Sequence, residues 1–243
     1  MTTRHAALVL SCLLTWATVA RGEAPDDKPA SRTERKVEGW TVRIDDRLLA
    51  GPDAPLGTRC LRFLEAKLCD IVAVVPADRL AKLRGVAIVL DLSHGGLKSM
   101  QYHPSADWLK GHGYAADLAK CVHIPRAADL PVRRNINEQP WVILHELAHA
   151  YHDQVLGFDE PRIDAAYKKY KASGRGDATL LYDGRKVKHY ALTTRMEFFA
   201  EMTEAYFGVN DFYPFTRAEL KQTEPEIDEL LTHIWASSVA PKP

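Results

Sequence analysis

Residues 140–157 read Pro-Trp-Val-Ile-Leu-His-Glu-Leu-Ala-His-Ala-Tyr-His-Asp-Gln-Val-Leu-Gly, and this stretch decides how the chain is interpreted. Apolar residues surround the five-residue pattern His145-Glu146-Leu147-Ala148-His149. Asn137 is a suitable helix cap, Pro140 fits a first helical turn, and Gly157 is typical of the position just past a helix end. We therefore expect one helix here, with the pattern in its middle.

The pattern is H-E-x-x-H, with two histidines four residues apart. On a helix such residues share a face, about 6 Å apart along the axis, so both imidazoles can bind one metal ion. Burying two histidines and a glutamate in an apolar helix without partners would be costly. The spacing therefore predicts His145 and His149 as zinc ligands. Glu146 is the expected general base, which takes a proton from a metal-activated water as that water attacks a carbonyl.

A catalytic zinc site needs a third protein ligand. His152 shares the face of the two histidines but lies about 10 Å along the axis from His145, too far to bind the same ion. His152 also does not fit the metzincin continuation, which has glycine at this position. We expect His152 to take a packing or supporting role.

The other source of a third ligand is a helix expected from Thr194 to Gly208. Glu197, Glu201 and Glu204 form one stripe on it, at positions i, i+4 and i+7. Large apolar residues flank the stripe, which is unusual for a solvated face. One inward carboxylate would complete a His₂Glu site. Glu197 is nearest the helix start, and Glu201 could hydrogen-bond a ligand histidine.

The segment from Tyr190 to Glu201 reads Tyr-Ala-Leu-Thr-Thr-Arg-Met-Glu-Phe-Phe-Ala-Glu, downstream of His-Glu-Leu-Ala-His. It resembles the catalytic domain of anthrax lethal factor and the related secreted Pro-Pro endopeptidases. In that group a glutamate begins an E-F-F-A-E-like helix, and a tyrosine lies seven residues before it. Tyr190 and Glu197 have the same separation. The resemblance extends over residues 140–207.

This resemblance implies that Glu197 is the third zinc ligand and that the Tyr190 hydroxyl steadies the oxyanion. It also implies a gluzincin with a zincin-like α+β fold. In that fold a small twisted mixed sheet lies over the active-site helix, and the glutamate-bearing helix lies behind. Residues 23–135 carry no such resemblance, so the substrate specificity of the family does not transfer, and proline-directed cleavage is only one option.

The rest of the chain fits a single α+β domain over residues 37–243. Residues 180–190 indicate a hairpin in which Asp183-Gly184 forms a type I′ turn. Other periodic or β-branched stretches predict strands at Val37–Ile44, Val86–Leu92 and Lys120–Ile124, and helices at Thr58–Ile71, Arg162–Ala172 and Glu224–Trp235.

Residues 1–22 have the layout of a secretory signal peptide: Arg4 and His5, an apolar run over residues 6–20, and a small-residue exit. The run is short for a membrane span. We therefore expect a secreted or periplasmic protein with no membrane span after processing, and a solvated lead-in over residues 23–36. The full chain has 32 basic and 32 acidic residues. This balance argues against nucleic acid as a partner.

Other residues leave alternatives open. Cys60, Cys69 and Cys121 are either free thiols, or Cys121 pairs with one of the other two. A buried strand at Val86–Leu92 could present an edge that aligns an extended peptide. Four scattered histidines are expected to be surface or hydrogen-bonded residues rather than a second metal site: His94, His103, His112 and His123.

Three functions are consistent with these features. The first is a secreted zinc endopeptidase that acts on a peptide or protein substrate with one Zn²⁺ ion. The second is a zinc hydrolase of another amide, such as a cell-wall amidase. The third is a zinc-stabilised binding module without turnover, against which Glu146 argues because a structural site has no need of a base.

Overall fold

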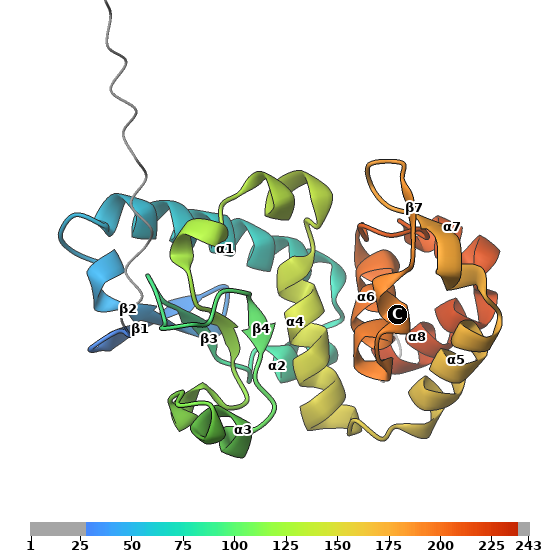
Figure 1. The fold of residues 1–243 in the computed structure, drawn as a ribbon, viewed down its shortest axis with the longest axis horizontal. Helices are drawn as coiled ribbons and strands as arrows, with labels where there is room; N and C mark the ends of the chain where they lie inside the picture. The colour runs from blue at the N-terminus through green and yellow to red at the C-terminus, as the bar shows by residue number, and fades with distance from the viewer. Residues whose placement is uncertain (1–27, 238–243) are drawn as a thin grey trace, which may run out of the picture.

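A computed structural model describes residues 28–237, in which helices surround a small mixed sheet. The predicted signal peptide, residues 1–22, lies outside the described residues. Figure 1 shows the small sheet and helices α1–α3 on one side of helix α4, and helices α5–α8 on the other. Within residues 28–237, no helix combines the length and apolar character needed to cross a membrane.

The sheet has five strands in the order β1-β2-β3-β5-β4. Strands β2, β3 and β5 run parallel, and the two edge strands β1 and β4 run antiparallel to their neighbours. The bounds are Arg32–Val37 for β1, Trp40–Asp45 for β2, Ile88–Leu90 for β3, Gln101–Tyr102 for β4 and Val122–Ile124 for β5. The predicted strands around residues 86–92 and 120–124 are therefore confirmed.

Three expectations for this sheet are wrong. Val37–Ile44 is not one strand, because Glu38 (φ 49°) and Gly39 (φ 93°) form a tight turn between β1 and β2. The lead-in is shorter than expected, since residues 32–36 belong to β1, an exposed edge strand whose charged side chains look like a solvated segment in the sequence. Strand β3 is central, so it offers no free edge to a peptide.

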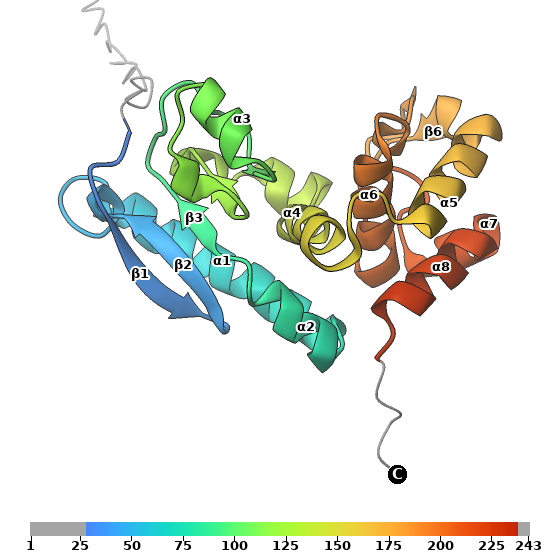
Figure 2. The ribbon, with the colours of Figure 1, turned by 90° about the horizontal axis from the view of Figure 1, so that it is seen from below.

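Helix α1 (Ala54–Val74) runs along one face of the sheet (Figure 2), followed by α2 (Ala77–Leu83). Helix α1 starts four residues before the predicted Thr58, whose hydroxyl donates to the Ala54 carbonyl and caps nothing. Close packing against Leu48 requires glycine at position 57, because a Cβ there would lie 1.9 Å from the Leu48 carbonyl oxygen. Cys60 and Cys121 are buried and Cys69 is exposed, and within residues 28–237 all three are free thiols.

Helix α4 (Val142–Tyr151) contains the H-E-x-x-H pattern and continues as a π-helical turn over residues 152–156. Gly157 ends it with φ 85°, as predicted. The predicted cap is wrong, because Asn137 lies in a separate turn, Arg134–Glu138, and Trp141 precedes the helix. Pro140 has no N–H to extend the hydrogen bonds of that turn, so the two segments are distinct.

Helix α3 (Ala106–Gly111) lies with the sheet in the first half of the domain (Figure 1). The elements that follow α4 form the second half: α5 (Pro161–Ala172), the hairpin β6 (Thr179–Leu180) and β7 (Lys186–Val187), α6 (Arg195–Phe207), α7 (Arg217–Thr223) and α8 (Pro225–Trp235). The predicted helices α5, α6 and α8 and the hairpin are confirmed. The turn type is wrong, since Gly184 has φ 85° but Asp183 lacks the positive φ that a type I′ turn needs.

Helix α6 determines where the second half of the site lies. The Thr194 hydroxyl accepts a hydrogen bond from the Glu197 N–H at 3.2 Å, which fixes the first turn. Helix α6 then packs side by side with α4 (Figures 1 and 2). Phe199 stacks on Trp235 of α8 with the rings 9° from parallel, and this apolar contact holds α6 from behind.

Candidate metal centre

The structure brings His145 and His149 of α4 together with Glu197 of α6. The two histidine Nε2 atoms are 3.1 Å apart, and Glu197 Oε2 lies 3.1 Å from His145 Nε2 and 3.3 Å from His149 Nε2. Four ligands about 2.05 Å from a tetrahedral zinc ion lie about 3.3 Å from each other. The three atoms therefore have the spacing of three ligands of one ion.

The surroundings of these atoms favour positive charge. Burial disfavours a charged ring, yet hydrogen bonds with Glu197 and Glu204 raise the pKa of His145 well above its usual value. Burial likewise opposes ionisation of Glu197, but hydrogen bonds with the two histidines lower its pKa to about 2. Two imidazole nitrogens and a carboxylate oxygen at this spacing need a cation or a proton between them. The donor set fits a divalent metal such as zinc.

Glu204 orients His145. Its Oε1 accepts from His145 Nδ1 at 2.7 Å and from Gln139 Nε2 at 2.9 Å. A proton on Nδ1 leaves the lone pair on Nε2 free to bind a metal. We expected Glu201 in this role, but its nearest oxygen is 3.7 Å from His145 Nδ1. The i+7 spacing from Glu197 places Glu204 on the same helix face, and only the packing of α6 on α4 shows that it reaches the ring.

Glu201 and Asp211 lie behind this contact. Burial and the neighbouring Glu204 charge raise the pKa of Glu201 well above its usual value. The same two causes raise the pKa of Asp211 to about 7. Both carboxyl groups therefore hold protons more readily than ordinary side chains, which limits the negative charge behind His145.

Glu146 lies beside the three candidate ligands and is 8% exposed. Its Oε2 accepts a hydrogen bond from the backbone N–H of Tyr102 on strand β4, at 2.8 Å. Burial raises the pKa of Glu146, opposed by His145, His149 and the Tyr102 N–H. A carboxylate with a raised pKa is better suited to take a proton near neutral pH.

A cavity of about 890 Å³ opens over this cluster. Its walls include Glu146, the three candidate ligands, Gln101 and Tyr102 from the edge strand β4, and Tyr190. Tyr190 is in a short 3₁₀ turn, Tyr190–Leu192, not in a strand, and it is 47% exposed. Its burial and the nearby Glu197 charge raise its pKa, so the hydroxyl keeps its proton and can donate.

Two further histidines near the centre are packed away from it. His152 is fully buried against Phe158 and Phe199, and neither ring nitrogen has a partner, so it has the packing role we expected. The sequence predicts no role for His189; its ring stacks on Phe212, and its Nδ1 accepts a hydrogen bond from the Ala191 N–H at 3.1 Å. Burial lowers the pKa of His152 to about 4 and that of His189 to about 3, so both rings are neutral.

Comparison with known proteins returned no match among family models, curated proteins or solved structures.

Proposed function

We propose that this chain is a zinc-dependent endopeptidase that acts outside the cytoplasm, with a zincin-like fold. One observation carries the proposal: three ligand-type atoms lie 3.1–3.3 Å apart, with the Glu146 carboxylate beside them in one open cavity. A binding module would need the three atoms but not a buried carboxylate next to them. The N-terminal sequence supports export.

His145, His149 and Glu197 are the residues that would hold the ion, and Glu204 holds His145 in the tautomer that binding requires. A zinc ion bound there supplies Lewis-acid chemistry, which polarises a carbonyl and lowers the pKa of water. Glu146 takes the proton of the attacking water and passes it to the leaving amine. Tyr190, on the wall of the same cavity, donates a hydrogen bond to the developing oxyanion.

The first experiment measures zinc content and cleavage of a mixed peptide library for the chain from residue 23 onward. Glu146→Gln should keep one zinc per chain and lose about 100-fold to 10,000-fold in cleavage rate, because the base is removed and the ligands are not. Glu197→Ala should lose both the metal and the activity. Glu229→Gln, an exposed glutamate on α8, is the matched control and should change neither.

The other outcomes separate the alternatives. If the wild-type chain binds zinc but cuts no peptide, a binding module or a hydrolase of another amide is the better conclusion, and cell-wall fragments are the next substrates. If the wild-type chain binds no metal, the proposal is wrong. If Glu146→Gln cuts as fast as wild type, Glu146 is not the base.

A further inference from the structure

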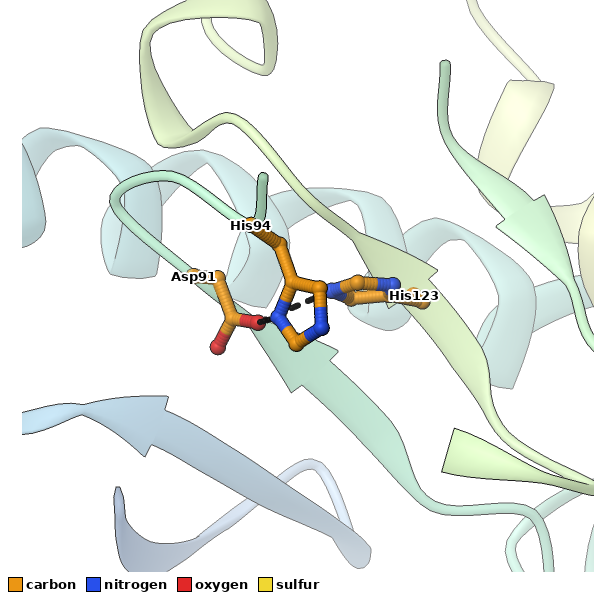
Figure 3. Close-up of side chains that lie close together, drawn as sticks. All are labelled: Asp91, His94 and His123. Atoms are coloured by element: carbon orange, nitrogen blue, oxygen red, sulfur yellow. Dashed lines mark hydrogen bonds and ion pairs between the residues drawn. The ribbon is translucent and has the colours of Figure 1, made fainter. Parts of the chain in front are cut away.

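A second group of histidines and a carboxylate lies at the end of the central strands. This sheet-end cluster consists of Asp91, directly after β3, His94 in the following turn, and His123 on β5. His94 Nδ1 is 2.7 Å and His123 Nε2 is 2.9 Å from the same oxygen, Asp91 Oδ2 (Figure 3). All three residues are buried. His94 and His123 are far apart in the sequence, but the parallel strands β3 and β5 bring them together at Asp91.

The sheet-end cluster has the residue types of a metal site, but Arg32 of β1 already supplies its positive charge. The guanidinium donates to both Asp91 oxygens at 2.7 Å, and its Nη2 is 3.3 Å from His94 Nδ1. A divalent ion bound to Asp91 Oδ2 would sit against this guanidinium, and two cations at that distance repel strongly. Arg32 and both rings instead act as donors to one ionised carboxylate, whose pKa they hold well below its usual range despite burial.

The hydrogen bonds continue from this cluster to His103, which lies between Tyr102 and Pro104, two residues that line the cavity. His103 Nε2 lies 3.2 Å from His123 Nδ1, and the His103 ring is buried. If His123 donates from Nε2 to Asp91, its Nδ1 is an acceptor, and His103 must be the donor to it. Burial and the neighbouring rings lower the pKa of His103 to about 4, so the ring is neutral. The chain of bonds therefore runs from His103 through His123 to Asp91.

His103 directly follows β4, the strand that holds Glu146 through the Tyr102 N–H. Strand β4 has only two residues paired with β5, Gln101 with His123 and Tyr102 with Val122. So short a ladder needs other contacts to hold it. The His103 backbone adds two, to the Cys121 carbonyl at 3.1 Å and from the Lys120 N–H at 2.7 Å. The ring of His103 adds the bond to the buried strand β5.

On the far side of β4, the Tyr102 hydroxyl donates to Asp153 Oδ2 at 2.5 Å, beyond the end of α4. Strand β4 is thus held from the sheet by the His103 ring and from α4 by the Tyr102 ring. We propose that His103 is a positioning residue for Glu146: its bond to the His123–Asp91 pair holds β4 where the Tyr102 N–H fixes the Glu146 carboxylate. This inference deepens the proposed function and rests on it only for the role of Glu146.

The test compares His103→Leu, His103→Gln and His94→Leu. Leucine at 103 removes the donor and leaves His123 Nδ1 buried and unpaired, whereas glutamine places an amide N–H near the position of Nε2. His94→Leu is the matched control, because His94 also donates to Asp91 but does not reach β4. Two quantities are measured: hydrogen exchange of the Tyr102 amide, and kcat and KM for a peptide that the wild type cleaves.

We expect His103→Leu to exchange the Tyr102 amide at least about 10-fold faster and to lower kcat about 10-fold to 100-fold, with KM and zinc content unchanged. His103→Gln should recover most of both. His94→Leu should keep wild-type exchange at Tyr102 and wild-type kcat. The inference is overturned if His103→Leu leaves the Tyr102 amide protected, or if His94→Leu and His103→Leu change kcat alike. If the wild type cleaves no peptide, the proposed function fails, and the exchange of Tyr102 alone decides the inference.

Discussion

Two separate sites in residues 28–237 each bring two histidines and a carboxylate together, and they differ in what faces the carboxylate. Between α4 and α6, nitrogen and oxygen atoms of three residues point at one another across 3.1–3.3 Å on the wall of a cavity. No arginine or lysine in residues 28–237 forms an ion pair with any of the three. In the sheet-end cluster, Arg32 donates two hydrogen bonds to Asp91, and the three cluster residues Asp91, His94 and His123 are buried.

The difference shows that residue types alone do not make a metal site. Both clusters hold two histidines and one carboxylate at hydrogen-bond distance. One has no cation of its own and is open to the cavity. The other carries a guanidinium that already compensates the carboxylate. The position of one arginine therefore separates a candidate metal centre from a set of structural hydrogen bonds.

The largest expected effect comes from removing that arginine. Arg32→Ala leaves Asp91 buried without its cation, which should lower the free energy of unfolding by about 3–5 kcal/mol. Added zinc should recover part of this loss, because the obstacle to a cation at Asp91 is gone. Urea unfolding with and without zinc measures both changes.

The control for Arg32→Ala is Arg35→Ala, an exposed arginine on the same strand, which should change stability by less than about 0.5 kcal/mol. If the wild-type chain bound two zinc ions with Arg32 in place, the conclusion that Arg32 keeps a metal ion out of the sheet-end cluster would be wrong. Equal losses in the two arginine variants would also contradict it.

The second prediction concerns the carboxylate behind His145. Glu204→Gln should weaken zinc binding about 10-fold to 100-fold, because the charge that favours the Nδ1 proton of His145 is lost. Glu201→Gln should weaken it less, since burial and Glu204 already favour the neutral form of Glu201 through its raised pKa. Competition with a coloured zinc chelator measures both affinities, and a larger effect at Glu201 would reverse the assignment.

The smallest effect is expected at His152, a buried histidine whose ring forms no hydrogen bond to a carboxylate within residues 28–237. At neutral pH, His152→Leu should raise the free energy of unfolding by about 1 kcal/mol, because two unpaired ring nitrogens are removed. Its pKa is lowered to about 4 in the folded chain. Between pH 6.5 and 4 the unfolded chain therefore takes up a proton that the folded chain does not, and the wild type loses stability as the pH falls.

His152→Leu removes this contribution, so its advantage over wild type should grow as the pH falls from 6.5 to 4. Urea unfolding of metal-free protein across this range measures the effect. An advantage that shrinks toward pH 4 would contradict the prediction.

Most of the side chains that meet at the candidate centre could be predicted from the sequence. His145 and His149 are one helical turn apart, and Thr194 caps the helix that carries Glu197. These are relations within a few residues, where helix geometry decides which side chains share a face. Element boundaries are harder to predict: Pro140 separates α4 from the turn before it, and the exposed edge strand β1 has the charged composition of a solvated segment.

By itself the sequence thus determined that His145 and His149 share one helix face, that Glu146 lies beside them, and which helix supplies Glu197. Only the tertiary structure decided which distant residues contact each cluster. Glu204 meets His145 across 59 residues, the Tyr102 N–H meets Glu146 across 44, and Arg32 meets Asp91 across 59. The physical reason is that helix periodicity acts over a few residues, whereas these contacts depend on how α6 and the strands β1 and β4 pack against the rest of the fold.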